Sequence, residues 1–456
     1  MKKSLTKILG ISLLAIAMTV TTFPTSAKAL DSISEPVIEE AAESSDSQSQ
    51  SQSQNSVVAI QESLSDDGIN LEELKSEQND YPIVLVHGCM GWGRDEKLGF
   101  KYWGGTVDLQ EKMRDAGYEV YTAAVGPISS NWDRACELYA YIVGGRVDYG
   151  AAHAAKYGHD RYGKTYSGIY KKISSDNKIH LVGHSQGGQT VRTFTQLINQ
   201  GSEDERSYGQ KDISPLFQGG NDWINSVTTI STPNDGTTLS DAIPFVDYIT
   251  PLCGIAGVAT GSNDLVNSYF DFKLDQWGLA KQDNESQVHY MGRVLSSKIW
   301  ERTTDMCSYD LSTYGGEELN KWVKAQPNVY YFSWTTSATK PSAITGHHIP
   351  QPGVMNKNFY VNSLMMGKYT RNDNSGRPVI DKSWWQNDGY VNCISQNGPK
   401  LGSNDIIKEY NGTPVKGQWN AMPTLINVDH EDIIGRYGNV TQWYIDRCKQ
   451  LSSLPE

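Results

Sequence analysis

Residues 179–188 read Ile-His-Leu-Val-Gly-His-Ser-Gln-Gly-Gly. The apolar residues at the start predict a buried strand, and residues 186–198 predict a helix. Between them, residues 183–187 have the pattern Gly-x-Ser-x-Gly, which holds Ser185 in a strained turn from strand to helix. Glycines stand on both sides because side chains there would collide with neighbouring backbone. The stretch predicts an α/β fold with the Ser185 hydroxyl in a cleft, unless the serine belongs to an ordinary glycine-rich turn.

A serine nucleophile needs a base and an acid that orients the base, and after this kind of turn the chain order is serine, acid, histidine. Four of the nine histidines follow Ser185. We predict His430 as the base, because apolar residues 425–428 precede it and would carry it to the carboxyl edge of a sheet. We predict Asp388 as the acid, since it lies in an Asn-Asp-Gly turn between apolar residues, where a purely structural turn aspartate is an equally good interpretation. Asp429 is the nearest rival, but a residue adjacent to the histidine usually points to the other side of the chain.

Hydrolysis through a serine nucleophile also needs backbone N–H donors for the oxyanion of the tetrahedral intermediate. One donor comes from the residue after the nucleophile, which is Gln186. The other should follow an early strand, and residues 82–86 predict a β-branched strand that runs into His-Gly. The N–H of Cys89 is therefore the second predicted donor.

Four blocks of sequence, several of them with tryptophan, carry a resemblance to a known family: residues 86–94, 99–105, 130–137 and 271–279. Over about residues 80–450 the chain resembles the thermoalkalophilic bacillar and staphylococcal secreted lipases. The resemblance implies an α/β-hydrolase fold, with a mostly parallel central sheet flanked by helices, and the triad Ser185, Asp388 and His430. The family usually has an aromatic residue at the position of Cys89. Because the donor there is a backbone N–H, catalysis should survive, but no acyl-chain preference can be carried over.

The same resemblance implies a zinc site at Asp133, His153, His159 and Asp305, in a small subdomain around residues 130–165 and 300–307. Imidazole nitrogens and carboxylate oxygens suit zinc, and four protein ligands without an open position indicate a structural metal. Without the resemblance, we would interpret the two histidines as solvated loop residues, because a spacing of six does not place two side chains on one helical face.

The family also binds calcium near the catalytic histidine. Gly353 and Asp432 fit the first two ligand positions, a loop carbonyl and a carboxylate two residues past the histidine. Residues 436–438 read Arg-Tyr-Gly where the second acid is expected, and calcium requires several oxygen ligands. The calcium site is therefore either rebuilt or lost.

The amino-terminal 79 residues differ from the rest in composition. Three lysines precede the apolar residues 8–20, and Ala-Lys-Ala follows at 27–29, which predicts a signal peptide over residues 1–29 and a secreted, extracellular protein. A membrane anchor is the alternative, but thirteen apolar-leaning residues are too few to span a bilayer. Residues 30–79 are acidic and rich in serine and glutamine, which predicts a disordered linker or pro-segment.

Residues 80–456 are predicted to form the catalytic body. Residues 31–80 carry thirteen acidic side chains against one lysine, and residues 1–30 carry four lysines, so only −4 of the net charge of −12 belongs to residues 81–456. A mildly acidic body without a basic stripe excludes nucleic acid as a partner. Six cysteines without framework spacing allow fifteen pairings, and in a body of this size we expect free thiols.

Residues 243–259 are apolar on more than one face and must be covered. They are either an ordinary core helix or, as the resemblance implies, part of a helical lid over residues 240–270 that exposes its apolar face at a lipid surface.

The residues and the resemblance together predict a secreted serine ester hydrolase, a triacylglycerol lipase or carboxylesterase acting on lipid or ester substrates at an interface. An esterase for insoluble polyesters would need the same triad in a more open groove. A non-catalytic surface-binding module on a hydrolase scaffold is the alternative of another class. We expect structural zinc, no stable membrane anchor and, by default, a monomer.

Overall fold

The computed structural model describes residues 63–65, 67–71, 76–94, 96, 99–247, 249 and 271–456. The predicted signal peptide (1–29), most of the predicted linker (30–79) and most of the predicted lid (240–270) lie outside these residues.

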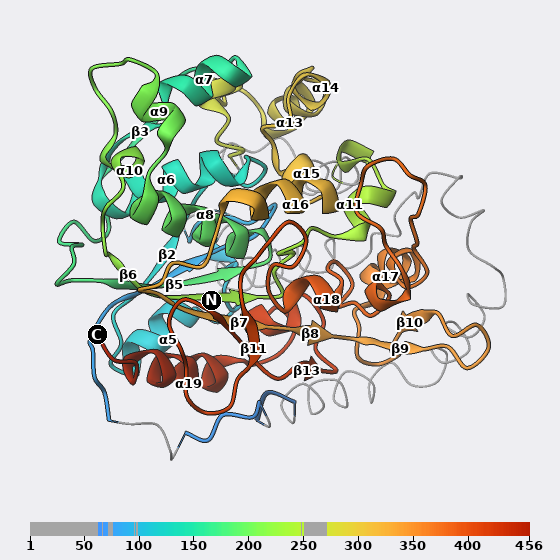
Figure 1. Ribbon diagram of the computed structural model, residues 1–456. Coiled ribbons are helices and arrows are strands. Elements are labelled where there is room, and N and C mark those ends of the chain that lie inside the picture. Colours follow the sequence, from blue (N-terminus) through green and yellow to red (C-terminus); the bar gives the residue numbers. More distant parts are fainter. Residues whose placement is uncertain are drawn as a thin grey trace, which may run out of the picture.

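A seven-stranded sheet forms the centre of the molecule (Figure 1), and every neighbouring pair of its strands is parallel. The strand order is β11-β12-β7-β6-β5-β1-β2. The strands are β1 (Ile83–Val86), β2 (Val120–Ala123), β5 (Ile179–His184), β6 (Ile224–Ile230), β7 (Tyr330–Trp334), β11 (Ile407–Glu409) and β12 (Trp419–Ala421). Parallel strands are covered on both faces, which explains why β1, β5 and β6 are buried along their whole length. The mostly parallel sheet predicted from the sequence is confirmed.

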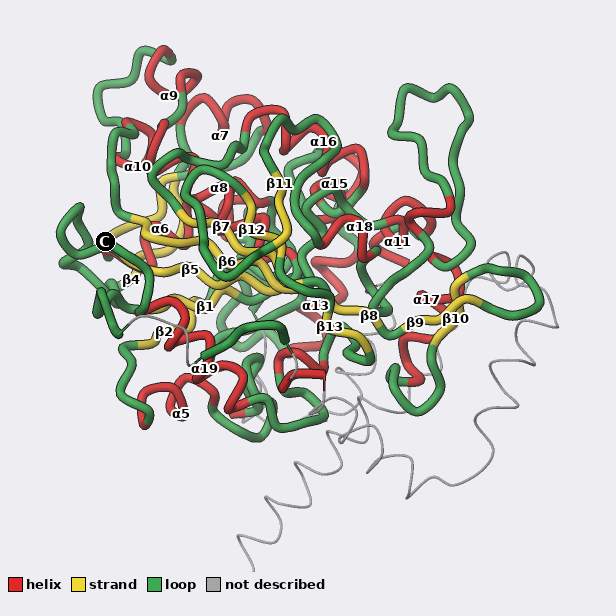
Figure 2. The backbone as a smooth tube through the Cα atoms, turned by 60° about the horizontal axis from the view of Figure 1, so that its bottom comes forward, coloured by secondary structure: helices red, strands yellow, loops and turns green. Residues whose placement is uncertain are grey.

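Helices cover both faces of the sheet, with α6 (Asn131–Val143) and α8 (Gln186–Gln200) on one face and α5 (Leu109–Asp115) and α19 (Thr441–Ser452) on the other (Figures 1 and 2). Alternate side chains of β1 enter two different cores. Ile83 and Leu85 pack with residues of α5 and α19, whereas their neighbours Val84 and Val86 pack with residues of α6 and α8. Since successive side chains of a strand point to opposite faces, the continuous apolar sequence of β1 is the pattern that a doubly covered strand requires.

Shorter elements surround this framework. Three two-stranded ladders pair β3 (Gly145–Asp148) with β4 (Tyr162–Tyr166), β9 (Thr339–Pro341) with β10 (His348–Pro350), and β8 (Thr336–Ser337) with β13 (Leu425–Ile426). The other α-helices are α7 (Ala151–Tyr157), α9 (Glu203–Ser207), α10 (Pro215–Gln218), α11 (Thr238–Ala242), α13 (Gln287–Leu295), α14 (Ile299–Arg302), α15 (Cys307–Asp310), α16 (Thr313–Trp322), α17 (Tyr360–Met366) and α18 (Cys393–Gln396). The 3-10 helices are η3 (Asp275–Trp277), η4 (Lys357–Phe359), η5 (Lys382–Trp384) and η6 (Asp432–Ile434).

The segment before His430 reaches the edge of the sheet through a short ladder. Residues 425–428 do not form a strand of the central sheet, because β13 spans only Leu425–Ile426 and pairs with β8. The strand β8 begins at Thr336, two residues after the end of β7. The ladder therefore lies past the carboxyl end of a central strand, and it still delivers His430 to that edge of the sheet.

The described end of the acidic amino-terminal segment packs on the body. Leu64 is buried in the core beside α19. The Asp67 carboxylate lies 2.8 Å from Nη1 of Arg447 in α19, and both side chains are buried. Nδ2 of Asn79 donates to three carbonyl groups at the end of α19. The amino-acid composition does not reveal these contacts, because a few apolar and polar residues are enough to attach an otherwise acidic segment to α19.

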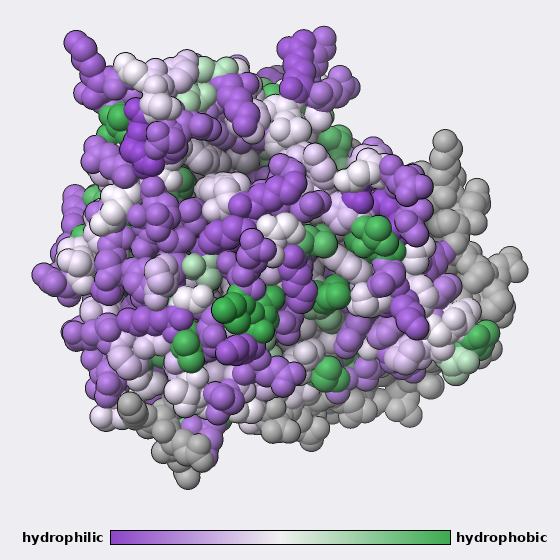
Figure 3. Space-filling model, viewed as in Figure 1, coloured by the Kyte–Doolittle hydropathy of each residue, from purple (hydrophilic) through white to green (hydrophobic). Residues whose placement is uncertain are grey.

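The molecular surface is mostly polar where it can be viewed in Figure 3, with separate small hydrophobic patches. Within the described residues, no helix combines the length and the apolar character that crossing a membrane requires.

Candidate active site

Ser185 stands at the sharp turn between β5 and α8. Its backbone has φ 56° and ψ −132°, a conformation that an L-residue seldom adopts and that marks stored strain. A Cβ on Gly183 would lie 2.4 Å from the backbone of Gly187, and a Cβ on Gly187 would lie 2.2 Å from the carbonyl oxygen of Val86. Both glycines are therefore required by close backbone approach, as the sequence pattern predicted.

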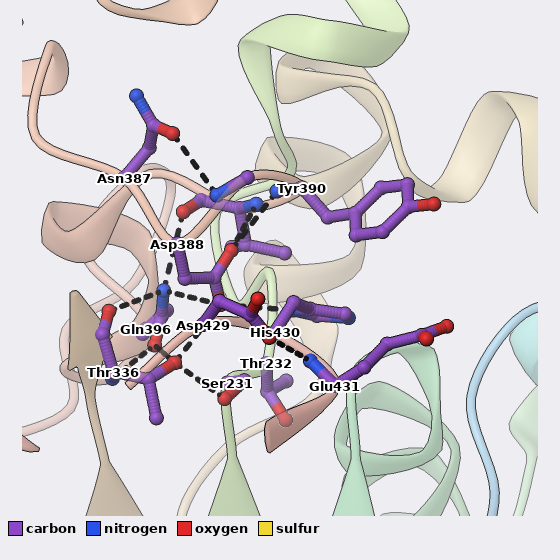
Figure 4. Close-up of polar contacts among 12 residues, drawn as sticks. Ser231, Thr232, Thr336, Asn387, Asp388, Tyr390, Gln396, Asp429, His430 and Glu431 are labelled. Carbon is purple, nitrogen blue, oxygen red and sulfur yellow. Dashed lines mark hydrogen bonds and ion pairs between the residues drawn. The ribbon is translucent and has the colours of Figure 1, made fainter. Parts of the chain in front are cut away.

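His430 and Asp388 form a buried pair (Figure 4). Nδ1 of His430 lies 2.8 Å from Oδ2 of Asp388, and the His430 backbone N–H donates to the Asp388 carbonyl at 3.0 Å. The ring of His430 lies 4.6 Å, between centroids, from the ring of His184, which immediately precedes Ser185. The pair of His430 and Asp388 therefore lies against the end of β5 next to Ser185, although more than 200 positions separate Ser185 from either residue.

The two oxygens of Asp388 have different partners (Figure 4). Oδ1 accepts the backbone N–H groups of Tyr390 at 3.0 Å and Val391 at 2.8 Å, which closes the Asn-Asp-Gly turn. Oδ2 faces His430 and also accepts hydrogen bonds from Oγ1 of Thr336 at 2.9 Å and Nε2 of Gln396 at 3.1 Å. The structural and the catalytic interpretation of Asp388 are therefore compatible, since one oxygen serves the turn and the other serves the histidine.

The rival carboxylate of Asp429 bonds to backbone instead. It accepts N–H groups from Asn356 at 2.8 Å and from Glu431 and Asp432 at 2.9 Å each. Burial raises the pKa of Asp429 to about 7, which these N–H donors only partly offset. Asp429 shapes the loop around His430, while Asp388 orients the imidazole.

Two backbone N–H groups are available for an oxyanion. Within the described residues, the structure gives no hydrogen-bond partner to the N–H of Cys89 or of Gln186. A buried side chain anchors the loop that carries Cys89, because the guanidinium of Arg134 donates to the carbonyl oxygen of His87. Nε2 of Gln186 donates to the Ser129 carbonyl at 3.0 Å, so the side chain of the second donor residue is also anchored.

A buried tyrosine that the sequence analysis did not single out connects these parts. The Tyr102 hydroxyl accepts the Gly88 N–H at 2.9 Å and lies 2.7 Å from Nδ1 of His184. Nε2 of His184 lies 2.9 Å from the His430 carbonyl oxygen, to which it donates. Burial lowers the pKa of His184 far below its ordinary value, so the ring stays neutral and can hold both contacts. The loop that contains Gly88 and the loop that contains His430 are thereby linked through His184, the residue that precedes Ser185.

A second cluster lies beside α6. Ligand atoms of Asp133, His153, His159 and Asp305 all lie within 4.8 Å of one another, and the cluster is largely buried. His153 is on α7, and His159 follows Gly158, which ends that helix in a left-handed conformation with φ 80°. The turn at Gly158 reverses the chain, so two histidines six positions apart reach the same point without sharing a helical face.

The donor set of this cluster fits a metal. Oδ1 of Asp133 and Nε2 of His159 are buried atoms without a hydrogen-bond partner among the described residues. Nδ1 of His159 bonds to the Asp160 carbonyl at 2.8 Å, which leaves Nε2 as the ligand atom. Burial lowers the pKa of His153, but the carboxylates of Asp305 and Asp133 outweigh this effect and raise it to about 9. The cluster therefore attracts positive charge.

Further side chains support the cluster and were not found from the sequence. Nε2 of Gln276 donates to Oδ2 of Asp133 at 2.7 Å, and the ring of Trp132 stacks on His153 with centroids 4.8 Å apart. Glu205 accepts the His153 backbone N–H at 2.8 Å. These residues come from η3, α6 and α9, so no local pattern could have joined them.

Comparison with known proteins shows to which family the chain belongs. Residues 79–450 match the family described as lipase-like, C-terminal domain. The chain belongs to this family. Among solved structures, EstA from Clostridium botulinum is 57% identical with a TM-score of 0.81, covering 88% of this chain and 99% of that one. Lipase 1 from Pelosinus fermentans is 50% identical with a TM-score of 0.74, covering 83% of this chain and 100% of that one.

Curated lipases of staphylococci are also similar. The lipase of Staphylococcus epidermidis is 38% identical over 390 residues, which cover 83% of this chain and 53% of that lipase. The chain spans about half the length of the curated relatives it matches.

The two residues predicted as calcium ligands lie on two segments that are in contact. Gly353, with φ 75°, stands three residues before Asn356, which bonds to Asp429. Asp432 accepts the Asp429 N–H at 3.0 Å. The guanidinium of Arg436 lies over the rings of Trp92 and Phe100, 4.6 Å and 5.2 Å from their centroids. Calcium at Gly353 and Asp432 stays a prediction.

Proposed function

We propose that the chain is a secreted serine ester hydrolase that acts on lipid esters through an acyl-enzyme. The observation that carries the proposal is the combination of the strained Ser185 turn, the buried pair of His430 and Asp388, and two N–H groups without partners beside them. Relatives that share this fold over most of the chain are named lipases. Secretion through residues 1–29, the linker at 30–79 and a lid over residues 240–270 are part of the proposal.

In the proposed mechanism, His430 takes the proton of the Ser185 hydroxyl as the oxygen attacks the ester carbonyl. Asp388 holds the ring so that Nε2 can accept this proton, and its negative charge stabilises the imidazolium. The N–H groups of Cys89 and Gln186 bind the oxyanion of the tetrahedral intermediate. His430 then protonates the leaving alcohol, and a water molecule activated by the same ring releases the fatty acid.

The metal in this proposal is zinc, held by Asp133, His153, His159 and Asp305. Two imidazoles and two carboxylates suit zinc, and a metal held there by four protein ligands would contribute to folding stability.

Turnover of p-nitrophenyl esters of graded chain length by wild type and by Ser185→Ala tests the function. The variant should lose activity by a factor on the order of 10⁶, because the triad acts as a unit. Ser174→Ala is the matched control, because the Ser174 hydroxyl accepts hydrogen bonds only within its own turn, from Asn177. A Ser185→Ala protein that keeps more than about a tenth of wild-type activity would refute the assignment of Ser185 as the nucleophile, whereas a wild-type protein without turnover would favour a non-catalytic binding module.

A further inference from the structure

Two cysteines lie against each other next to the proposed oxyanion hole. Sγ of Cys89 lies 3.8 Å from Sγ of Cys307, and among the five described cysteines this is the pair whose sulfurs are in contact. Cys89 follows β1, and Cys307 is the first residue of α15. They are 218 positions apart, so the contact is a product of the tertiary fold alone.

Both cysteines are held against the same segment. The N–H of Cys307 donates to the Ile128 carbonyl at 3.0 Å. The N–H of Met90, next to Cys89, donates to the Pro127 carbonyl at 2.8 Å. Because neighbouring carbonyl groups hold the two backbones close together, the sulfurs stay next to each other, and a disulfide requires them to close to about 2 Å.

The two sulfurs differ in access. Cys89 is partly exposed, whereas Cys307 is fully buried. A dissolved reagent therefore meets Cys89 first, and Cys307 can react only with a sulfur that is already on Cys89. This order of access is the one required of a reactive cysteine and its resolving partner.

We propose that Cys89 and Cys307 form a reversible disulfide that lowers turnover, with a low-molecular-weight disulfide as the oxidant. The Cys89 thiolate attacks one sulfur of the reagent and expels one thiol, which leaves a mixed disulfide on Cys89. The Cys307 sulfur then attacks the Cys89 sulfur and expels the second thiol. The two cysteines lose two protons and two electrons, and the reagent gains them as two free thiols, so the step balances.

The link acts on turnover through the backbone of Cys89, and this part rests on the proposed function. Closing the sulfurs from 3.8 Å to about 2 Å draws Cys89 toward Cys307 and so changes the position of its N–H group. Removal of one oxyanion donor costs on the order of 10²–10³ in kcat. A displaced donor should lower kcat by about tenfold or more, with a smaller effect on KM, because the donor acts in the transition state.

The test treats reduced, full-length protein with glutathione disulfide and follows intact mass, linked peptides and ester hydrolysis. We expect a mass loss of two hydrogen atoms, a peptide linking Cys89 to Cys307, a lower kcat, and recovery with dithiothreitol. Ser185→Ala should form the same link, so the chemistry of the sulfurs is measured independently of the esterase activity.

Cys307→Ser should have wild-type kcat when reduced and should keep a glutathione adduct on Cys89 when oxidised, because it lacks the resolving sulfur. Cys448→Ser, which removes a buried cysteine of α19, should respond as wild type does. A retained adduct in the wild type, a link from Cys253 in place of Cys307, or the expected link with unchanged kcat would overturn the proposal.

Discussion

The carboxylate of Asp388 shows how one residue can belong to a turn and to the proposed catalytic site together. The N–H groups of Tyr390 and Val391 fix the orientation of the carboxylate through Oδ1, so Oδ2 meets the imidazole without freedom to rotate. Thr336 and Gln396 donate to the same Oδ2, which keeps the buried charge satisfied. Geometry of this kind is preorganised before substrate arrives.

Replacement of this residue gives the first prediction. Asp388→Asn should leave the protein folded but lower kcat by a factor on the order of 10⁴, because an amide favours the wrong tautomer of the histidine. Asp429→Asn is the control, and it should lower the melting temperature, since Asp429 accepts three backbone N–H groups, yet keep kcat within a few-fold. Steady-state kinetics below the melting temperature of both variants decide the matter, and the reverse ranking of the two kcat values would assign the acid to Asp429.

At the scale of elements, the central strand β5 carries two neutral buried histidines besides the nucleophile turn. Nδ1 of His180 lies 2.7 Å from the Ser226 hydroxyl on β6, and Nε2 lies 2.9 Å from Oδ1 of Asn79. Burial lowers the pKa of His180 to about 3. The His180 ring thus attaches the segment before β1 to strand β5, and this ring must remain uncharged.

A pH dependence of stability follows. The unfolded chain takes up a proton at His180 near the ordinary histidine value of about 6.5, whereas the folded chain does so only near 3. This histidine's contribution to stability is therefore complete above pH about 6.5 and decreases as the pH falls, by about 1.4 kcal/mol per pH unit. Urea unfolding at pH 6.5 and 4.5 should show a decrease about 2–3 kcal/mol larger in wild type than in His180→Gln. Equal decreases in the two proteins would show that His180 is charged in the native state.

At the scale of the whole molecule, the metal cluster joins distant parts of the chain. Asp133 lies in the first turn of α6, His153 lies on α7, His159 follows α7, and Asp305 precedes α15. Met306, next to Asp305, forms a bridge with Ser129, whose carbonyl holds the Gln186 side chain. A metal bound there would stabilise the native fold because the unfolded chain does not assemble the four ligands.

Chelation should therefore affect stability before activity. Prolonged treatment with a chelator should lower the melting temperature by more than it lowers the initial rate of ester hydrolysis at low temperature. His153→Ala should have the low melting temperature from the start and should show no further loss with chelator. Elemental analysis that finds well below one zinc per chain, unchanged by added zinc, would contradict the assignment.

Several features follow from neighbouring residues and are visible in the sequence. The strand, turn and helix around Ser185 have a local pattern of apolar residues and glycines. The physical reasons for that pattern extend beyond it, since a side chain on Gly187 would meet the Val86 carbonyl of β1 and β5 is buried along its whole length. The same holds for β1, whose apolar run ends in the His-Gly loop.

Other features depend on distant parts of the chain. The Thr336 and Gln396 partners of Asp388, the link from Tyr102 to His184, the contact of Cys89 with Cys307 and the meeting of Asp305 with His153 each join residues on separate elements. A short-range sequence pattern cannot encode such pairs, because whether two distant residues make contact depends on how their elements pack together. The Gly158 turn and the packing of the central sheet set that geometry, and so the folded chain, rather than any local motif, brings these groups together.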